Sequence, residues 1–254
     1  MRSSTNDGVP RSVLGDFLYL MDVTNWLVLL SLMLWIVAVV HFYGRTQSNH
    51  HFDWVHFITR VGVFGAISTV LYVVPLFHFN LFFLPPFLEL HFDEIPAFII
   101  GFAYGPWTAF GIIFIKTIIK VMMGSQTMYI GELSDLIYST VFVIPAVWIY
   151  QKKRNMKGVA IGFGVSTLLH LIVTSVVNVF MILPFYMSLY GMTYEGLLAL
   201  CQLANPAIKD LYWGYTLFAN LPLNLIKDAI VIAVTFVIYR SIHKLLHYDK
   251  PVGK

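Results

Sequence analysis

The sequence predicts an all-α integral membrane protein with six or seven transmembrane helices. Of its 254 residues, 58% are hydrophobic and only 11% are charged, whereas soluble domains carry about 25% charged residues. The mean hydropathy of +0.76 agrees with a membrane protein. A helix that crosses the hydrocarbon layer needs about 20 mainly apolar residues, so the chain has room for these helices and for no separate soluble domain. The net charge of +3 is too small to indicate a nucleic-acid partner.

Seven apolar segments can be read along the chain. The third is too short to cross a bilayer alone, and Gly105-Pro106 separates it from the fourth because proline cannot donate a backbone hydrogen bond. The first is followed by a polar linker and is expected to be an added transmembrane or interfacial helix, so the count stays at six or seven. We therefore expect an N-terminal extension (1–56), a six-helix domain (57–246) and a basic tail (247–254). The segments are Phe17–Phe42, Phe57–Phe77, Ile95–Tyr104, Trp107–Met123, Leu133–Tyr150, Val159–Tyr190 and Tyr215–Tyr239.

Basic residues predict the orientation of these segments. The connection QKKRNMKG contains four basic residues and no acid, and the tail after Tyr239 is also basic. Both are expected on the cytoplasmic side, because short loops rich in Lys and Arg stay there. Two segments lie between them, which is consistent with both being on one side. The connections around 79–94, 124–132 and 188–214 are then expected on the outer side.

Polar residues inside apolar segments form two helical faces. His170, Thr174 and Asn178 recur every four residues, and so do Asn220, Asn224 and Asp228, with Lys227 close to Asn224. An unpaired polar group costs several kcal/mol in hydrocarbon, so each needs a protein partner, a cavity or a ligand. Hydrogen bonds between helices are the alternative to ligand contact, and for His170 and Thr174 the residues leave this open.

Further ionisable residues flank the predicted outer connections. Lys116 and Lys120 share one face, and Glu132 and Asp135 begin the next segment. The sequence FFLPPFLELHFDEIP joins an apolar strip to acidic residues and is typical of a lid over a cavity. For Lys120 we favour snorkelling to the headgroups, and for Asp93 capping of a helix is a sufficient role.

Other residues narrow the class of protein. Cys201 has no companion and is expected to fill apolar space, and His50, His51 and His56 are expected in a solvated loop instead of a metal site. The chain has no phosphate-binding G-x-x-x-x-G-K-[ST] loop, so a partner or an ion gradient must supply any energy.

Several motifs occur in an order that resembles a known family. They are GAISTVLY, FLPPFLELHFDEIPAFIIGFAYGP, FIKTIIK, GELSDL, KKRNMKG, NVFMILPFY and NLPLNLIKDAIV, between Thr59 and Leu246. This succession resembles the S components of energy-coupling factor (ECF) transporters, the substrate-binding subunits of bacterial vitamin importers, and is most similar to those that bind riboflavin. The N-terminal segment lies outside the resemblance.

The resemblance implies a six-helix bundle in the bacterial cell membrane with a cytoplasmic C-terminus. Such a subunit captures its vitamin from outside and delivers it with a membrane coupling (T) subunit and two cytoplasmic ATPases. It is not an enzyme and uses no cofactor or metal. Small residues spaced by four on its first helix dock to the coupling subunit, and Gly62 and Ala66 match that spacing. The same pair could instead pack helices within the subunit.

The resemblance also implies a substrate site. By motif position the contacts transfer to Lys116, Asp135, Asn178, Asn224 and Lys227, and Leu90 and Glu94 join them from the lid sequence. An Asn amide could match the uracil-like edge of a flavin through both its donor and its acceptor. Asp135 stands where the family usually has Asn, and Asp228, often Gly in the family, could pair with Lys227. Pantothenate or a thiamine precursor is therefore an alternative ligand, and a membrane-embedded enzyme is the alternative class.

Overall fold

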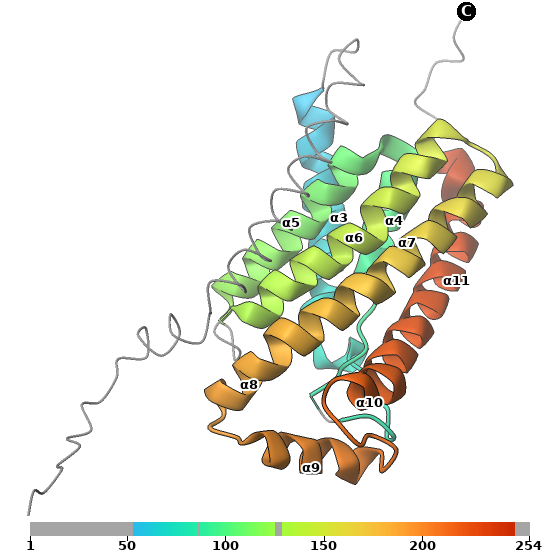
Figure 1. Ribbon diagram of the computed structural model, residues 1–254. Helices are drawn as coiled ribbons and strands as arrows, with labels where there is room; N and C mark the ends of the chain where they lie inside the picture. The colour runs from blue at the N-terminus through green and yellow to red at the C-terminus, as the bar shows by residue number, and fades with distance from the viewer. Residues whose placement is uncertain (1–52, 86, 125–128, 247–254) are drawn as a thin grey trace, which may run out of the picture.

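The protein is a bundle of helices that run roughly side by side (Figure 1). The computed structural model describes residues 53–85, 87–124 and 129–246, with side chains to residue 241. The predicted segment Phe17–Phe42, most of the predicted extension and the tail 247–254 lie outside the described residues. The helices are α3 (Trp54–Val73), η1 (Pro75–Phe77), α4 (Glu94–Tyr104), α5 (Pro106–Met122), α6 (Ile130–Lys152), α7 (Met156–Val177), η2 (Asn178–Ile182), α8 (Leu183–Leu189), α9 (Tyr194–Ala204), α10 (Trp213–Tyr215), η3 (Thr216–Asn220) and α11 (Leu221–Leu246).

The lengths of the apolar helices agree with a protein that crosses the membrane several times. Among the described residues, four helical stretches are long and apolar enough to span a bilayer: Trp54–Val73, Ile130–Lys152, Met156–Leu189 and Trp213–Ser241. The predicted all-α membrane fold is therefore confirmed. Helix α5 has 17 residues and α4 has 11.

The short helix α4 lies inside the bundle. Every residue from Glu94 to Ala103 is buried, and α4 contacts α3, α5, α6 and α11. A helix that is apolar on all sides is stable when neighbouring helices cover it. Neighbours thus surround the segment that is too short to cross alone.

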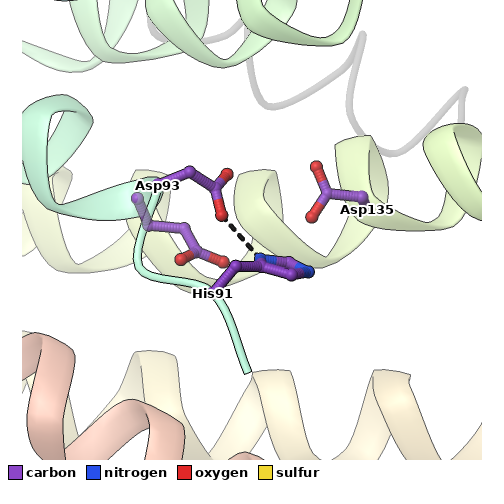
Figure 2. Close-up of side chains that lie close together, drawn as sticks. His91, Asp93 and Asp135 are labelled. Atoms are coloured by element: carbon purple, nitrogen blue, oxygen red, sulfur yellow. Dashed lines mark hydrogen bonds and ion pairs between the residues drawn. The ribbon is translucent and has the colours of Figure 1, made fainter. Parts of the chain in front are cut away.

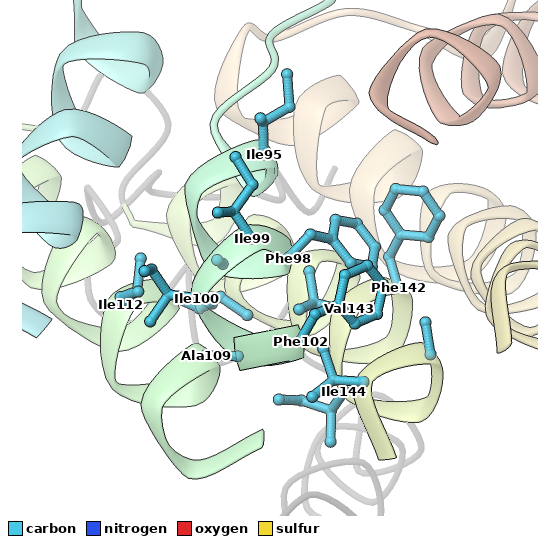
Figure 3. Packing of buried hydrophobic residues seen from close by; sticks show 14 of the residues in the cluster. Ile95, Phe98, Ile99, Ile100, Phe102, Ala109, Ile112, Phe142, Val143 and Ile144 are labelled. Atoms are coloured by element: carbon cyan, nitrogen blue, oxygen red, sulfur yellow. The ribbon is translucent and has the colours of Figure 1, made fainter. Parts of the chain in front are cut away.

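Aromatic and aliphatic side chains of α4, α5, α6 and α7 fill the centre of the bundle (Figure 3). The ring centroid of Phe98 is 5.0 Å from that of Phe142 and 5.3 Å from that of Phe163. At Gly101 a Cβ atom would lie 2.7 Å from the Val147 side chain. Glycine is therefore needed there for α4 to approach α6 closely.

The two ends of the bundle differ. The turn between α6 and α7 and the end of α11 lie at one end, and the connection between α3 and α4 lies at the other with α9 (Figure 1). The basic turn and the chain leading to the basic tail therefore share an end, as their charges predict. Their assignment to the cytoplasm stays a prediction.

The connection before α11 contains a helix that the sequence pattern did not reveal. Helix α9 begins after Thr193, whose side chain accepts a hydrogen bond from Gly196 N. Its buried residues Leu197 and Cys201 pack into an apolar cluster with Leu183, Leu211 and Tyr215. Cys201 is thus an apolar filler, as expected.

Two wide helical turns interrupt the long helices. The π-helical segments η2 and η3 each end two residues before a proline, Pro184 and Pro222. Proline cannot donate to the carbonyl four residues earlier, and its ring clashes with that carbonyl. A wider turn accommodates this clash. Such π-helical turns often occur at functional sites.

Candidate ligand-binding site

A cavity of about 710 Å³ lies at the end of the bundle opposite the basic turn. This volume is within the range of small-molecule sites, about 300 to 1,000 Å³. The walls come from the ends of α3 and α5 and from α6, η2, α8, η3 and α11, and the connection between α3 and α4 contributes one side. The lining includes Tyr72, His78, Asn80, Phe87, Leu88, Glu89, His91, Lys120, Glu132, Asp135, Tyr138, Asn178, Tyr186, Asn220, Asn224 and Lys227.

The connection between α3 and α4 closes on itself beside the cavity. Phe79 and Leu90 exchange two backbone hydrogen bonds of 2.9 Å. The His78 ring lies 2.8 Å from the carbonyl oxygen of Tyr72 through Nε2 and 3.1 Å from a Glu89 oxygen through Nδ1. These contacts hold the segment that the sequence predicts as a lid.

A buried ion-pair network lies behind the cavity wall. Lys116 is fully buried and contacts Asp93, Asp135 Oδ2 at 2.9 Å and Ser139 Oγ at 2.9 Å. His91 Nδ1 lies 2.6 Å from Asp93 Oδ1, and Asp135 faces this pair (Figure 2). Burial lowers the pKa of His91, in the connection before α4, to about 4, so its ring is neutral near pH 7. The neutral ring donates Nδ1–H to Asp93.

A second ion pair joins α4 to α11. Lys227 Nζ lies 2.5 Å from Glu94 Oε1. Asp228 turns away and lies 3.0 Å from Nδ1 of His170 on α7. The sequence raised the possibility that Asp228 pairs with Lys227, and the structure corrects it. Successive residues on a helix point in different directions, so Lys227 and Asp228 reach different neighbours.

The acidic groups of this network also lie close enough together to surround a cation. Ligand atoms of His91, Asp93, Glu94 and Asp135 lie within 4.8 Å of one another. However, the ammonium groups of Lys116 and Lys227 already contact three of these carboxylates. Their positive charge identifies the cluster as an ion-pair network.

Three asparagines meet on another wall of the cavity. Asn178 is the first residue of η2, Asn220 the last residue of η3, and Asn224 follows one turn later. The Asn220 side chain bonds to both of the others, and Tyr138 bonds to Asn178. These bonds bring together polar residues from two long helices.

The predicted site residues divide into two groups. Asp135, Asn178, Asn224 and Lys227 line the cavity. The other three, Lys116, Glu94 and Leu90, do not appear in its lining. Lys116 and Glu94 are instead buried ion partners of Asp135 and Lys227, and Leu90 is buried in the apolar cluster beside α9. Ligand contact by all seven residues stays a prediction.

The structure decides several alternatives that the sequence left open. His170 is fully buried, stacks on Phe142 with centroids 4.9 Å apart and pairs with Asp228, so it joins helices. Lys120 lines the cavity, and its Nζ lies 5.6 Å from the centre of the Tyr72 ring, so a role at the cavity joins snorkelling as an alternative. Asp93 makes no capping hydrogen bond through its side chain, so capping is not its role.

Sequence reasoning missed several cavity residues. Tyr138, Tyr186 and His91 line the cavity but are common residue types near membrane segments and carry no positional signal. Asn220 was recognised on the polar face yet was not assigned to the site. Its spacing of four from Asn224 is the signal that could have identified it.

The surface of α3 bears the two predicted docking residues. Gly62 and Ala66 are exposed, and a Cβ atom at Gly62 would meet nothing within 4 Å. At Gly65, by contrast, a Cβ atom would lie 2.3 Å from the Ile115 side chain. Among the described residues, Gly65 therefore allows α3 to pack against α5, whereas Gly62 makes no such contact.

Fold and cavity together define a membrane protein with a cavity of the size of a small-molecule site. Comparison with known proteins identifies its family. The family model "ECF transporter, substrate-specific component" matches residues 56–239. The chain belongs to this family, which is a family of transporter components and not of enzymes.

Relatives in the family are named riboflavin transporters. The chain is 27% identical to the riboflavin transporter RibU of Staphylococcus aureus (strain TCH60) over 189 residues, which are 74% of this chain and 92% of that protein. It is 28% identical to the riboflavin transporter FmnP of Bacillus subtilis (strain 168) over 182 residues, 70% of this chain and 88% of that protein.

A solved structure has the same fold. It is described as "Structure and mechanism of the S component of a bacterial ECF transporter", and it matches with a TM-score of 0.59 and 23% identity. The match covers 76% of this chain and 99% of that one. The predicted S-component bundle is thereby confirmed.

Proposed function

We propose that this chain is the riboflavin-binding S component of an ECF importer. The observation that carries the proposal is the cavity of about 710 Å³, in which Asp135, Asn178, Asn224 and Lys227 converge from helices distant in sequence. The names of the relatives support riboflavin as the ligand.

The chemistry of the cavity suits a flavin. Phe87 and Leu88 supply an apolar surface for a tricyclic ring. Asparagine oxygens and the Lys227 ammonium group offer acceptors and donors for a uracil-like edge, and Asp135 and Glu132 can accept from ribityl hydroxyls. The Asp135 carboxylate is held by Lys116 behind it.

We further propose the orientation and the partners. The basic turn after α6 and the C-terminus lie in the cytoplasm of a bacterial cell, so the cavity opens toward the outer side. The exposed face of α3 at Gly62 and Ala66 docks to a membrane coupling subunit, which works with two cytoplasmic ATPases. Close approach of a partner helix at small residues supports this surface.

Ligand titration tests the proposal. Purified protein in detergent should quench flavin fluorescence saturably when riboflavin is added. Pantothenate and a thiamine precursor serve as competitors. If riboflavin shows no saturable binding at micromolar concentration while one of the others does, the ligand assignment is wrong and the transporter assignment stands.

Co-purification tests the partners. Affinity-tagged protein expressed in its native membrane should retain a coupling subunit and ATPases. Turnover of a lipid or isoprenoid substrate by the isolated chain would contradict the proposal and support the membrane-enzyme alternative.

A further inference from the structure

The three asparagines that line one wall of the cavity have fixed amide orientations, with their acceptor and donor atoms in defined places. Asn178, Asn220 and Asn224 are 7%, 1% and 8% exposed, and all three line the cavity. Each amide group has one accepting oxygen and two donor hydrogens. Whichever atom faces the cavity therefore determines which ligand groups can bind.

Backbone carbonyl groups show how two of these amides are oriented. The carbonyl oxygen of Thr174 lies 2.9 Å from the terminal amide of Asn178, and that of Asn220 lies 2.9 Å from the amide of Asn224. A backbone oxygen can only accept a hydrogen bond. The nearby side-chain atoms must therefore be the Nδ2 nitrogens.

Asn220 completes this orientation. Its Oδ1 accepts from Asn178 Nδ2 at 3.2 Å and from Asn224 Nδ2 at 3.0 Å. Its own Nδ2 donates to Ser175 Oγ at 3.2 Å. The Asn178 amide also donates to the Tyr138 hydroxyl at 3.2 Å. The Nδ2 groups of Asn178 and Asn224 each donate to two or more acceptors within the protein, and that of Asn220 donates to one.

The remaining oxygens are free to meet a ligand. Among the described residues, the Oδ1 atoms of Asn178 and Asn224 have no hydrogen-bond partner, although both side chains line the cavity. This differs from the expectation that an Asn amide presents both a donor and an acceptor to the ligand. On this wall Asn178 and Asn224 present acceptors.

We propose that Asn220 is a positioning residue that holds Asn178 and Asn224 with their oxygens toward the cavity, so that this wall selects a ligand edge with hydrogen-bond donors. The inference rests on the proposed function and refines it. In a flavin the matching donor is the imide N3–H, and its flanking carbonyls require donors such as Lys227. Asn220 acts through its neighbours and not by its own contact.

A pair of ligands tests the polarity in the unmodified protein. Riboflavin carries the N3–H donor, and N3-methylriboflavin lacks it. We expect the methylated ligand to bind at least about tenfold more weakly, the loss of one good hydrogen bond. Equal affinities would overturn the inference while leaving riboflavin binding intact, whereas absence of riboflavin binding would instead contradict the proposed function.

Variants at Asn220 distinguish two reasons for weaker binding of the methylated ligand. One is the lost hydrogen bond, and the other is the size of the methyl group. Asn220→Ala removes the Oδ1 acceptor that the other two amides share, so they are held less firmly, and the preference for riboflavin over the methylated ligand should fall severalfold. Asn220→Asp keeps an oxygen at the same place and should retain the preference. Asn205→Ala is the matched control, because Asn205 lies outside the cavity lining and bonds to Phe218 O and Ala207 N.

The outcomes are distinguishable. A preference that is unchanged in Asn220→Ala means that the methyl group is excluded by its size, which overturns the positioning role. An equal fall in Asn220→Ala and Asn220→Asp also overturns it, because the oxygen would then be irrelevant. The comparison of the two ligands in the unmodified protein does not depend on whether any variant folds.

Discussion

At the scale of single residues, buried ion pairs hold many side chains of the site in place. Lys116 is fully buried and contacts Asp93, Asp135 and Ser139. Moving a charge out of water is unfavourable, and pairing compensates only while both partners remain. Lys116 therefore holds two carboxylates in place beside the cavity.

Removing this ammonium group should destabilise the fold. In Lys116→Met, Asp93 loses an ion partner and so does Asp135. We expect the free energy of unfolding to fall by about 3 to 5 kcal/mol, the usual effect of breaking a buried pair. Thermal unfolding in detergent measures it.

Lys120→Met is the control for this change. Lys120 lies one turn further along α5 and contacts the Tyr72 ring instead of a buried acid. Equal stability of the two variants would show that the network contributes little.

The asparagines should matter for ligand affinity more than for stability. If each bonds the ligand in a dry site, Asn178→Ala or Asn224→Ala weakens riboflavin binding by about 1 to 3 kcal/mol. Titration of flavin fluorescence measures the change. Thr174→Val is the control, since Thr174 is buried one turn from Asn178 and is not in the cavity lining. Unchanged affinity in both Asn variants would assign the asparagines to helix packing.

The sequence predicted which residues are special but not how they pair. Asn178, Asn224 and Lys227 stand out because polar groups are unfavourable in hydrocarbon. Their partners depend on which helices become neighbours. Lys227 bonds to Glu94, which is 133 positions away, and not to the adjacent Asp228.

At the scale of elements, the two π-helical turns place the asparagines. Asn178 opens η2 and Asn220 closes η3, and a proline follows each turn. A π-helical turn contains one more residue per hydrogen-bonded ring than an α-helical turn. It therefore changes the direction in which the side chains around it point.

Replacing one of these prolines should disturb the site. Pro184→Ala restores a backbone donor and removes the clash that favours the wide turn. We expect an α-helical turn in its place and riboflavin affinity lower by about tenfold, as for one lost hydrogen bond.

Pro145→Ala is the matched control for Pro184→Ala. Pro145 lies inside α6, which continues as an α-helix around it, so its replacement should leave affinity unchanged. Equal affinities of all three proteins would mean that Pro184 does not control the position of Asn178.

The positions of apolar segments were more predictable than breaks within them or than helices of mixed polarity. The segment Ile95–Tyr104 matches α4 within one residue. Val159–Tyr190 was one segment in the sequence, but Pro184 and the wide turn divide it into α7, η2 and α8. Helix α9 was missed because only Leu197 and Cys201 are buried, so its pattern is not that of a span.

At the scale of the whole molecule, α3 is the least embedded of the long helices. Of its apolar span 17% is buried, compared with 67% for α6. Its exposed face carries Val63, Ile67 and Val70 next to Gly62 and Ala66. A partner helix could cover this face without displacing any contact within the bundle.

A pair of glycine substitutions separates docking from folding. Gly62→Leu should abolish association with the coupling subunit and leave riboflavin affinity unchanged, because a side chain there meets open space. Gly65→Leu should lower thermal stability, because its side chain overlaps Ile115. Co-purification and ligand titration give the two readouts. Normal association of Gly62→Leu would place the docking surface elsewhere.

The aromatic layer at the centre of the bundle also affects the membrane around the protein. Phe98, Phe102, Phe142 and Phe163 pack between the cavity and the basic end, with ring centroids 5.0 to 5.9 Å apart for the contacting pairs. An apolar layer of this kind opposes the passage of ions as hydrocarbon does. A cell can therefore hold many copies of this protein, with or without ligand in the cavity, without dissipating its membrane potential through ion leakage.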